Sequence, residues 1–208
     1  MIIERLEVGS YATNCYIVGD ESSKAGMIVD PGAEANWILQ MVKDLALDIK
    51  LIVLTHAHMD HMGALGEVKA ATGATLAMHG DDARSLQVKR PSGGSLSVSP
   101  ALPPPERLLK GGDSIEVGEL RFLVVHTPGH TPGGICLAGE GILFSGDTLF
   151  NLSVGRSDFP GGSHRQLIDG IVTRLMVLPN STIVYPGHGP ETTIGDERVG
   201  NPFLNGQA

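Results

Sequence analysis

The stretch LIVLTHAHMDHMG, residues 51–63, joins an apolar segment to three histidines and an aspartate. Its first four residues carry no polar side chain, which predicts a strand buried on both faces. Polar residues then cluster where that strand must end, which is where α/β proteins commonly place their sites. In an extended segment residues i and i+2 point the same way, so His56 and His58 can converge on one point. We expect the chain then to turn into a helix that points Asp60 and His61 at a neighbouring position.

Neutral imidazoles and a carboxylate are ligands that Zn²⁺, Fe²⁺ and Mn²⁺ accept, so this cluster predicts a metal site. One such histidine alone would be typical of a polar surface loop. Three further segments repeat the arrangement of an apolar run followed by a Gly-rich turn with a single potential ligand. They are LVVHTPGHTPG with His130, ILFSGDT with Asp147 and TIVYPGHG with His188. Each alone is typical of a turn residue, but strand ends gather at one edge of a sheet, so their recurrence favours a shared site.

The composition bounds the class of protein. A chain of 208 residues suits one domain over 1–208, and 41% hydrophobic with 18% charged residues suits a globular core. The formal charge of −8 argues against nucleic acid or an anionic membrane as partner. No apolar run approaches the length of a membrane span, and Glu4 and Arg5 interrupt any N-terminal signal segment. Cys15 and Cys136 could pair, but their strand-like apolar surroundings favour buried free thiols and therefore a cytoplasmic location.

Apolar periodicity predicts many strands with helices inserted singly between them. Helices are predicted over 34–47, about 63–71, 81–87, and a last long one that Ser163 caps. The apolar stripe of this last helix comprises Leu167, Ile168, Ile171 and Leu175. Residues 90–105 read as a surface loop, with a flap over the site as the alternative, and the polar tail from Gly187 onward as irregular. The predicted strands are IIERLEV, NCYIVG, AGMIVDPG, LIVLT, ATLAMHG, DSIEVG, LRFLVVHT, GGICLAG, GILFSGD and TIVYP. Two packed sheets with helices on their outer faces would accommodate these elements.

The run THAHMDH matches the H-x-H-x-D-H signature of the metallo-β-lactamase superfamily, which the chain resembles over essentially its whole length. Its remaining ligand positions are matched in order by His130, Asp147 and His188. The resemblance implies an α/β fold, an αββα sandwich of two mixed β-sheets with helices on the outer faces. It also implies that His56, His58 and His130 bind one metal ion and that Asp60, His61 and His188 bind a second. Asp147 would bridge the two.

The expected cofactors are two divalent metal ions, Zn²⁺ first, with Fe or Mn as alternatives. Their charge of +4 and the −2 of the two aspartate ligands leave a site of about +2, in which a bridging water loses a proton near neutral pH. The resulting hydroxide, oriented by the metal ligand Asp60, would attack a carbonyl that a metal polarises. We therefore expect metal-assisted hydrolysis, for which neither a cysteine nor a G-x-S-x-G elbow is needed.

Three segments narrow the resemblance to the short bacterial glyoxalase II branch, the hydroxyacylglutathione hydrolase type. They are GDTLF, GRSDFPGG and YPGHGPETTIGDE. That branch cleaves thioesters of glutathione such as S-lactoylglutathione, so the expected partner is a small-molecule thioester. Asp147 argues against the common β-lactamase subclass, which places a cysteine there. Two departures concern the substrate: the helical C-terminal region that grips glutathione is absent, and Asn151, Leu152 and Ser153 replace a polar-Gly-Ser sequence.

Other interpretations remain open. Arg156 is a candidate to bind an anionic substrate group, or a structural arginine paired with Asp158. His126 can support the site through its neighbours, or be a structural residue at a strand end. A mononuclear iron persulfide dioxygenase resembles the chain in GRxDF, and His56, His130 and Asp147 could supply its ligands. GDTLF and PGHGPETTIG favour the hydrolase. A metal-binding scaffold without catalysis is the third hypothesis.

Overall fold

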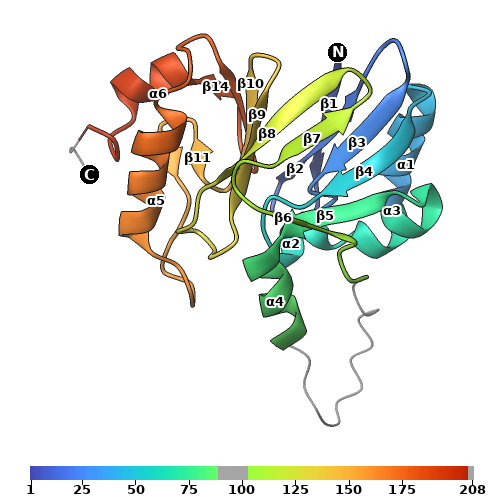
Figure 1. The fold of residues 1–208 in the computed structure, drawn as a ribbon, viewed down its shortest axis with the longest axis horizontal. Helices are drawn as coiled ribbons and strands as arrows, with labels where there is room; N and C mark the ends of the chain where they lie inside the picture. Colours follow the sequence, from blue (N-terminus) through green and yellow to red (C-terminus); the bar gives the residue numbers. More distant parts are fainter. Residues whose placement is uncertain (89–102, 206–208) are drawn as a thin grey trace.

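Two mixed β-sheets pack face to face in the computed structural model, which describes residues 1–88 and 103–205 (Figure 1). Within these residues each sheet has six strands, and each contains parallel and antiparallel neighbours. The first runs in the order β1 (Ile2–Val8), β2 (Thr13–Gly19), β3 (Ala25–Val29), β4 (Asp48–Val53), β5 (Thr75–His79) and β6 (Arg107–Leu109). The second runs in the order β14 (Thr192–Thr193), β13 (Ile183–Pro186), β10 (Ile142–Gly146), β9 (Ile135–Gly139), β8 (Leu120–His126) and β7 (Ser114–Val117). A separate short hairpin joins β11 (Leu149–Phe150) to β12 (Ser153–Val154).

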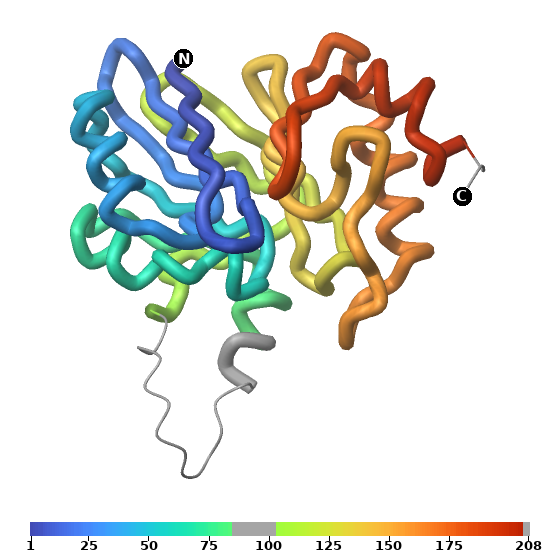
Figure 2. The backbone as a smooth tube through the Cα atoms, turned by 180° about the vertical axis from the view of Figure 1, so that it is seen from behind, coloured from blue at the N-terminus to red at the C-terminus, as the bar shows by residue number. Residues whose placement is uncertain are grey.

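Helices cover the outer faces of both sheets. On the first sheet lie α1 (Ala35–Asp44) and α3 (Leu65–Thr72), and on the second lie α5 (His164–Gly170), the π-helical turn η1 (Ile171–Leu175) and α6 (Ile194–Gly200). Two further helices, α2 (Met59–Met62) and α4 (Gly80–Val88), lie near the edge of the first sheet. Seen from behind, the N-terminal half of the chain forms one side of the molecule and the C-terminal part the other (Figure 2). This architecture confirms the expected αββα sandwich.

Strands buried on both faces explain the apolar runs of the sequence. In β2, Tyr16 and Val18 point into the core between the sheets, whereas Cys15 and Ile17 pack under the outer helices. Phe144 of β10 meets Tyr16 across the interface, with ring centroids 5.1 Å apart. On the outer face of the second sheet, the apolar stripe predicted for the last helix packs against the strands. Its Leu167, Ile171 and Leu175 are fully buried.

Most sequence-based expectations about the fold are confirmed. Ser163 caps α5, since its side chain accepts a hydrogen bond from the Gln166 amide. Cys15 and Cys136 are buried free thiols. Of the predicted loop 90–105, residues 90–102 lie outside the described residues, and the single domain over 1–208 stays a prediction. None of the helices in residues 1–88 and 103–205 is long and apolar enough to cross a membrane.

The expectation that the tail from Gly187 onward is irregular was wrong, because this segment forms β14 and α6. The side chain of Thr193 caps α6 by accepting from the Asp196 amide at 3.1 Å. Glu197 is fully buried and accepts hydrogen bonds from Leu152 N, Thr192 Oγ1 and Asn201 Nδ2. A buried carboxylate with three donors ties the tail to the β11–β12 hairpin. The sequence pattern also missed β6, β11 and β12, which are only two or three residues long.

We predict that Glu197→Ala destabilises the protein by about 2–4 kcal/mol, because the substitution removes the acceptor shared by Leu152 N, Thr192 Oγ1 and Asn201 Nδ2 and leaves the buried Thr192 hydroxyl without it. Chemical denaturation measures this change. Val199→Ala is the matched control on the same helix, since Val199 is 79% exposed and the substitution should change stability by less than about 0.5 kcal/mol. Equal effects of the two substitutions would show that α6 is held by something other than the Glu197 carboxylate.

Candidate metal centre

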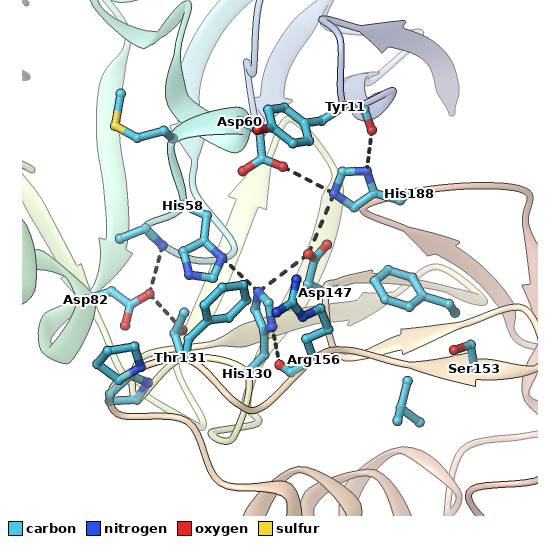
Figure 3. Close-up of a pocket in the computed structure, with 17 residues that line it drawn as sticks. Tyr11, His58, Asp60, Asp82, His130, Thr131, Asp147, Ser153, Arg156 and His188 are labelled. Atoms are coloured by element: carbon cyan, nitrogen blue, oxygen red, sulfur yellow. Dashed lines mark hydrogen bonds and ion pairs between the residues drawn. The ribbon is translucent and has the colours of Figure 1, made fainter. Parts of the chain in front are cut away.

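The structure brings together all seven side chains that the sequence predicts as metal ligands. They follow the carboxyl ends of strands in both sheets or lie on α2. Figure 3 shows His58, Asp60, His130, Asp147 and His188 facing one another. From the first sheet come His56, His58, Asp60 and His61, and from the second come His130, Asp147 and His188. Each turn that carries one of these residues begins where a strand ends, and α2 follows the turn after β4. The expectation that strand ends gather at one edge is therefore met, while the assignment of these residues as ligands stays a proposal.

Three histidines form the first group of donors. His58 Nδ1 lies 3.1 Å from His56 Nε2 and 2.9 Å from His130 Nε2, and these two Nε2 atoms are 3.3 Å apart. The nitrogens of a tetrahedral zinc site, each about 2.1 Å from the ion, are separated by roughly 3.4 Å. The triangle of nitrogens therefore has nearly the dimensions that one divalent ion requires.

Asp60, His61 and His188 form the second group. His188 Nε2 lies 3.3 Å from Asp60 Oδ2 and 3.3 Å from His61 Nε2, and the third side, from His61 Nε2 to Asp60 Oδ2, measures 3.6 Å. Two imidazoles and one carboxylate are again a donor set that Zn²⁺, Fe²⁺ or Mn²⁺ accepts.

Asp147 lies between the two groups. Its Oδ2 is 3.5 Å from His130 Nε2 and 3.6 Å from His188 Nε2, and its Oδ1 is 3.4 Å from His61 Nε2. Oδ1 is buried, and no hydrogen-bond partner for it is found within the described residues. Buried polar atoms are nearly always satisfied, so an orphaned carboxylate oxygen among imidazole nitrogens fits a bound cation. The residues present therefore fit a pair of divalent ions bridged by Asp147.

The ring nitrogens that face away from the centre have their own partners. His61 Nδ1 lies 2.9 Å from the buried Asp30 carboxylate, His130 Nδ1 lies 2.6 Å from the Arg156 carbonyl, and His188 Nδ1 lies 3.1 Å from the Tyr11 carbonyl. Acceptors at these positions hold the proton on Nδ1, which leaves Nε2 free to bind a metal. The orientation of these rings is therefore set by the protein.

Electrostatics differ between the two groups. Burial lowers the pKa of His56 well below its usual value, and His61 and His130 lower it further; burial also lowers the pKa of His58. Burial acts in the same direction on His61, but Asp30 and Asp147 outweigh it and raise the pKa of His61 to about 10. The hydrogen bond to Asp60 raises the pKa of His188. His56 and His58 are thus neutral rings with lone pairs available for a metal, whereas the neighbouring carboxylates favour the protonated forms of His61 and His188.

The centre opens into a cavity of about 1040 Å³ with a largely apolar rim, which includes Tyr11, Met59, Phe150 and Phe159. Arg156 also lines this cavity. Its guanidinium donates to both carboxylate oxygens of Asp158, at 3.0 and 2.9 Å, and lies 4.6 Å from the centre of the Phe159 ring. Both interpretations of Arg156 therefore find support, because it is paired with Asp158 and also faces the cavity. The apolar rim was not predicted, because its residues come from separate segments and follow no common pattern.

His126 contacts the turn that carries His130. Its Nε2 lies 2.9 Å from the Pro132 carbonyl, in the turn that carries His130, and its ring stacks on His79 at 4.1 Å with an interplanar angle of 13°. Asp81 lies beside this pair. The donor atoms of His79, Asp81 and His126 lie within 4.8 Å of one another, but His79 Nδ1 already accepts from the Asp81 amide at 3.2 Å and His126 Nε2 contacts Pro132.

No cysteine acts as a nucleophile beside this centre, since both described cysteines are buried in the layers under the helices. Burial raises the pKa of Cys136 to about 11 and that of Cys15 further still. Thiolates are therefore absent at neutral pH, which agrees with a metal-dependent rather than a cysteine-dependent reaction.

Comparison with known families assigns the class of protein. Residues 8–188 match the metallo-beta-lactamase superfamily, and the chain belongs to this superfamily. Among curated relatives, hydroxyacylglutathione hydrolase GloC of Haemophilus influenzae is 35% identical and is covered completely, as is this chain. The probable metallo-hydrolase YqgX of Bacillus subtilis is 34% identical over 97% of each chain.

Three solved structures share the fold at more than 30% sequence identity. The BLEG-1 B3 metallo-beta-lactamase has a TM-score of 0.88 and 37% identity, over 98% of this chain and 99% of its own. ETHE1 from Myxococcus xanthus has a TM-score of 0.82 and 32% identity, over 100% and 86% of the two chains. TTHA1623, described in a di-iron-bound form, has a TM-score of 0.82 and 36% identity, over 97% and 100%. The superfamily and a metal-dependent activity are thus established, whereas the substrate is not.

We predict that Gly187→Ala lowers metal content, because a Cβ at this position would overlap Asp147 Oδ1 and press on His61 Cε1. Elemental analysis of the purified protein after dialysis measures the change. Gly66→Ala is the matched control, since a Cβ there meets nothing within 4 Å. Unchanged metal content in the Gly187 variant would contradict the tight fit inferred around Asp147.

Proposed function

We propose that the protein is a binuclear metallohydrolase that cleaves thioesters, with S-lactoylglutathione as the representative substrate. The observation that carries this proposal is the position of Asp147, whose carboxylate lies between two complete sets of three donors. The full-length similarity to a hydroxyacylglutathione hydrolase supports the substrate class. Zinc is the first choice of metal, with iron and manganese as alternatives, and the di-iron form of TTHA1623 shows that a similar chain holds iron.

When bound, two divalent ions would acidify a water at neutral pH and polarise the scissile carbonyl. The protein residues then have separate tasks. Asp60 is partly exposed to the cavity, and its Oδ2 lies 3.3 Å from His188 Nε2 and 3.4 Å from Thr13 Oγ1. A carboxylate held by two partners in this way can accept a hydrogen bond from the attacking water and orient it. A thioester suits such a site because its thiolate leaves without a strong general acid, and the apolar rim limits access of other water.

The proposal also covers the partners and the cellular location of the enzyme. We propose a small-molecule thioester as partner, with neither nucleic acid nor membrane, and a cytoplasmic location, which the charge of −8 and the reduced cysteines support.

We predict that the wild-type protein binds about two metal equivalents per chain and releases free thiol from S-lactoylglutathione. Asp60→Ala should lower kcat/KM on the order of 10²-fold or more, because the attacking water loses the carboxylate that orients it. A thiol-reactive dye follows the reaction, and Asp48→Ala, at an exposed carboxylate far along β4, is the control. A fully active preparation with one metal ion per chain would contradict the binuclear proposal.

The similarity to ETHE1 favours one alternative, the persulfide dioxygenase with a single iron held by His56, His130 and Asp147. These residues do lie together, with Asp147 Oδ2 4.0 Å from His56 Nε2. An oxygen electrode with glutathione persulfide distinguishes the two reactions, since a hydrolase consumes no oxygen. A chromogenic β-lactam should be included because of the similarity to BLEG-1.

We predict that Arg156→Gln raises KM for an anionic thioester, by about tenfold, with little change in kcat, because one charge-assisted contact contributes to binding. Asp158→Asn should have the opposite effect on KM, since it releases Arg156 from its partner. Arg165→Gln is the control, because Arg165 is an exposed arginine on α5 outside the cavity. Identical KM values for all variants would assign Arg156 a purely structural role.

A further inference from the structure

A buried carboxylate, Asp82, joins the two turns that carry the first group of histidines. Asp82 lies in the first turn of α4 and is 1% exposed. Its Oδ2 accepts from Ala57 N at 2.8 Å and from Thr131 Oγ1 at 2.9 Å, and its Oδ1 accepts from Gly133 N at 2.7 Å. Figure 3 shows Asp82 beside Thr131, with a dashed line for the hydrogen bond between them.

The three donors are not metal ligands, but each is a close neighbour of one. Ala57 lies between His56 and His58, and Thr131 directly follows His130. The first turn extends from the first sheet and the second from the second sheet, so the carboxylate connects the two halves of the sandwich. A charge-assisted hydrogen bond is stronger than a neutral one, especially in a buried environment, so Asp82 restrains both backbones at once.

A glycine provides independent support for this close approach. A Cβ on Gly133 would lie 2.6 Å from Asp82 Oδ1 and 2.6 Å from the Asp82 amide nitrogen, closer than real side chains come. The turn after His130 therefore requires glycine here in order to contact the carboxylate directly.

Asp30, the buried carboxylate that contacts the second group of donors, is arranged differently. It accepts from Thr55 N at 2.7 Å and from Thr55 Oγ1 at 2.6 Å, and it contacts the ring of His61 itself at 2.9 Å. Asp30 thus acts directly on a ring of the second group. The three donors to Asp82 described above belong instead to the turns that set the distance between His58 and His130.

We propose that Asp82 is a positioning residue that holds His58 and His130 at the spacing of one metal ion and thereby sets the affinity of the first group. The inference rests on the metal-binding part of the proposed function and is independent of the thioester reaction. If wild-type protein binds metal but does not cleave thioesters, the proposed substrate fails while this inference is still decided by metal binding alone.

The test is metal binding by Asp82→Asn. An amide keeps one accepting oxygen but turns an NH₂ toward a donor, so at least one of the three donors loses its acceptor. We expect one of the two ions to bind about 10- to 100-fold more weakly, while the other keeps its affinity. Competition with a chromophoric chelator measures both affinities, and titration with Co²⁺ follows the two sites through their absorption.

A matched control separates positioning from a general loss of stability. Asp20 is also a buried carboxylate with several donors, namely Ser22, Ser23 and Glu119 N, and it lies outside the ligand turns. Asp20→Asn should lower the melting temperature without changing either metal affinity. Loss of one ion in the Asp20 variant, or equal affinities in Asp82→Asn and wild type, would overturn the proposal, as would equal weakening of both ions.

Two further variants test the same contact if Asp82→Asn does not fold. Thr131→Val removes one of the three donors, and Gly133→Ala pushes the turn off the carboxylate. Both should weaken the same single ion, whereas Gly66→Ala should leave both unchanged. Full affinity for both ions in the Thr131 and Gly133 variants would contradict the role of Asp82.

Discussion

The main physical constraint on the structure is the crowding of donor atoms around Asp147. These atoms repel one another and have lost contact with water. Imidazole nitrogens and carboxylate oxygens lie about as close to one another as the ligands of one ion, and among the described residues Asp147 Oδ1 is buried without a hydrogen-bond partner. Burying such groups is costly unless positive charge compensates them. The raised pKa of His61 is one form of that compensation, and divalent ions would be a stronger one. A rigid scaffold is needed to maintain this arrangement, and the sandwich supplies it.

The core between the sheets extends into the metal centre through β2. The Tyr16 hydroxyl, buried in this core, donates to the Pro186 carbonyl at 2.7 Å, and Asn14 Nδ2 donates to the same carbonyl at 2.9 Å. The backbone N–H of Asn14 donates a hydrogen bond to the Gly187 carbonyl as well. These contacts fix the turn that carries His188 against the first sheet. Packing of the aromatic core therefore also determines where a ligand of the second group lies.

The sequence could predict those parts of the site that depend on local spacing. His56, His58, Asp60 and His61 are close in the chain, and the ends of apolar runs marked the other ligands. The buried carboxylates were not predictable, because Asp82 acts on backbone groups 25 and 51 residues away, which no periodic pattern reports. The same reason explains the error in the tail. Glu197 fixes α6 through partners that include Leu152, a residue 45 positions earlier.

In the proposed function, an anionic group of the substrate would compete with Asp158 for Arg156. Both side chains of this ion pair are largely exposed, at 69% and 68%, and an ion pair in water contributes little to stability. An anionic group that enters the cavity would meet the same guanidinium beside the ring of Phe159. Because the ion pair with Asp158 is weak, exchanging it for a contact with the substrate would have a small cost. The ion pair therefore orients Arg156 and leaves its guanidinium available for the anionic group that we propose it binds.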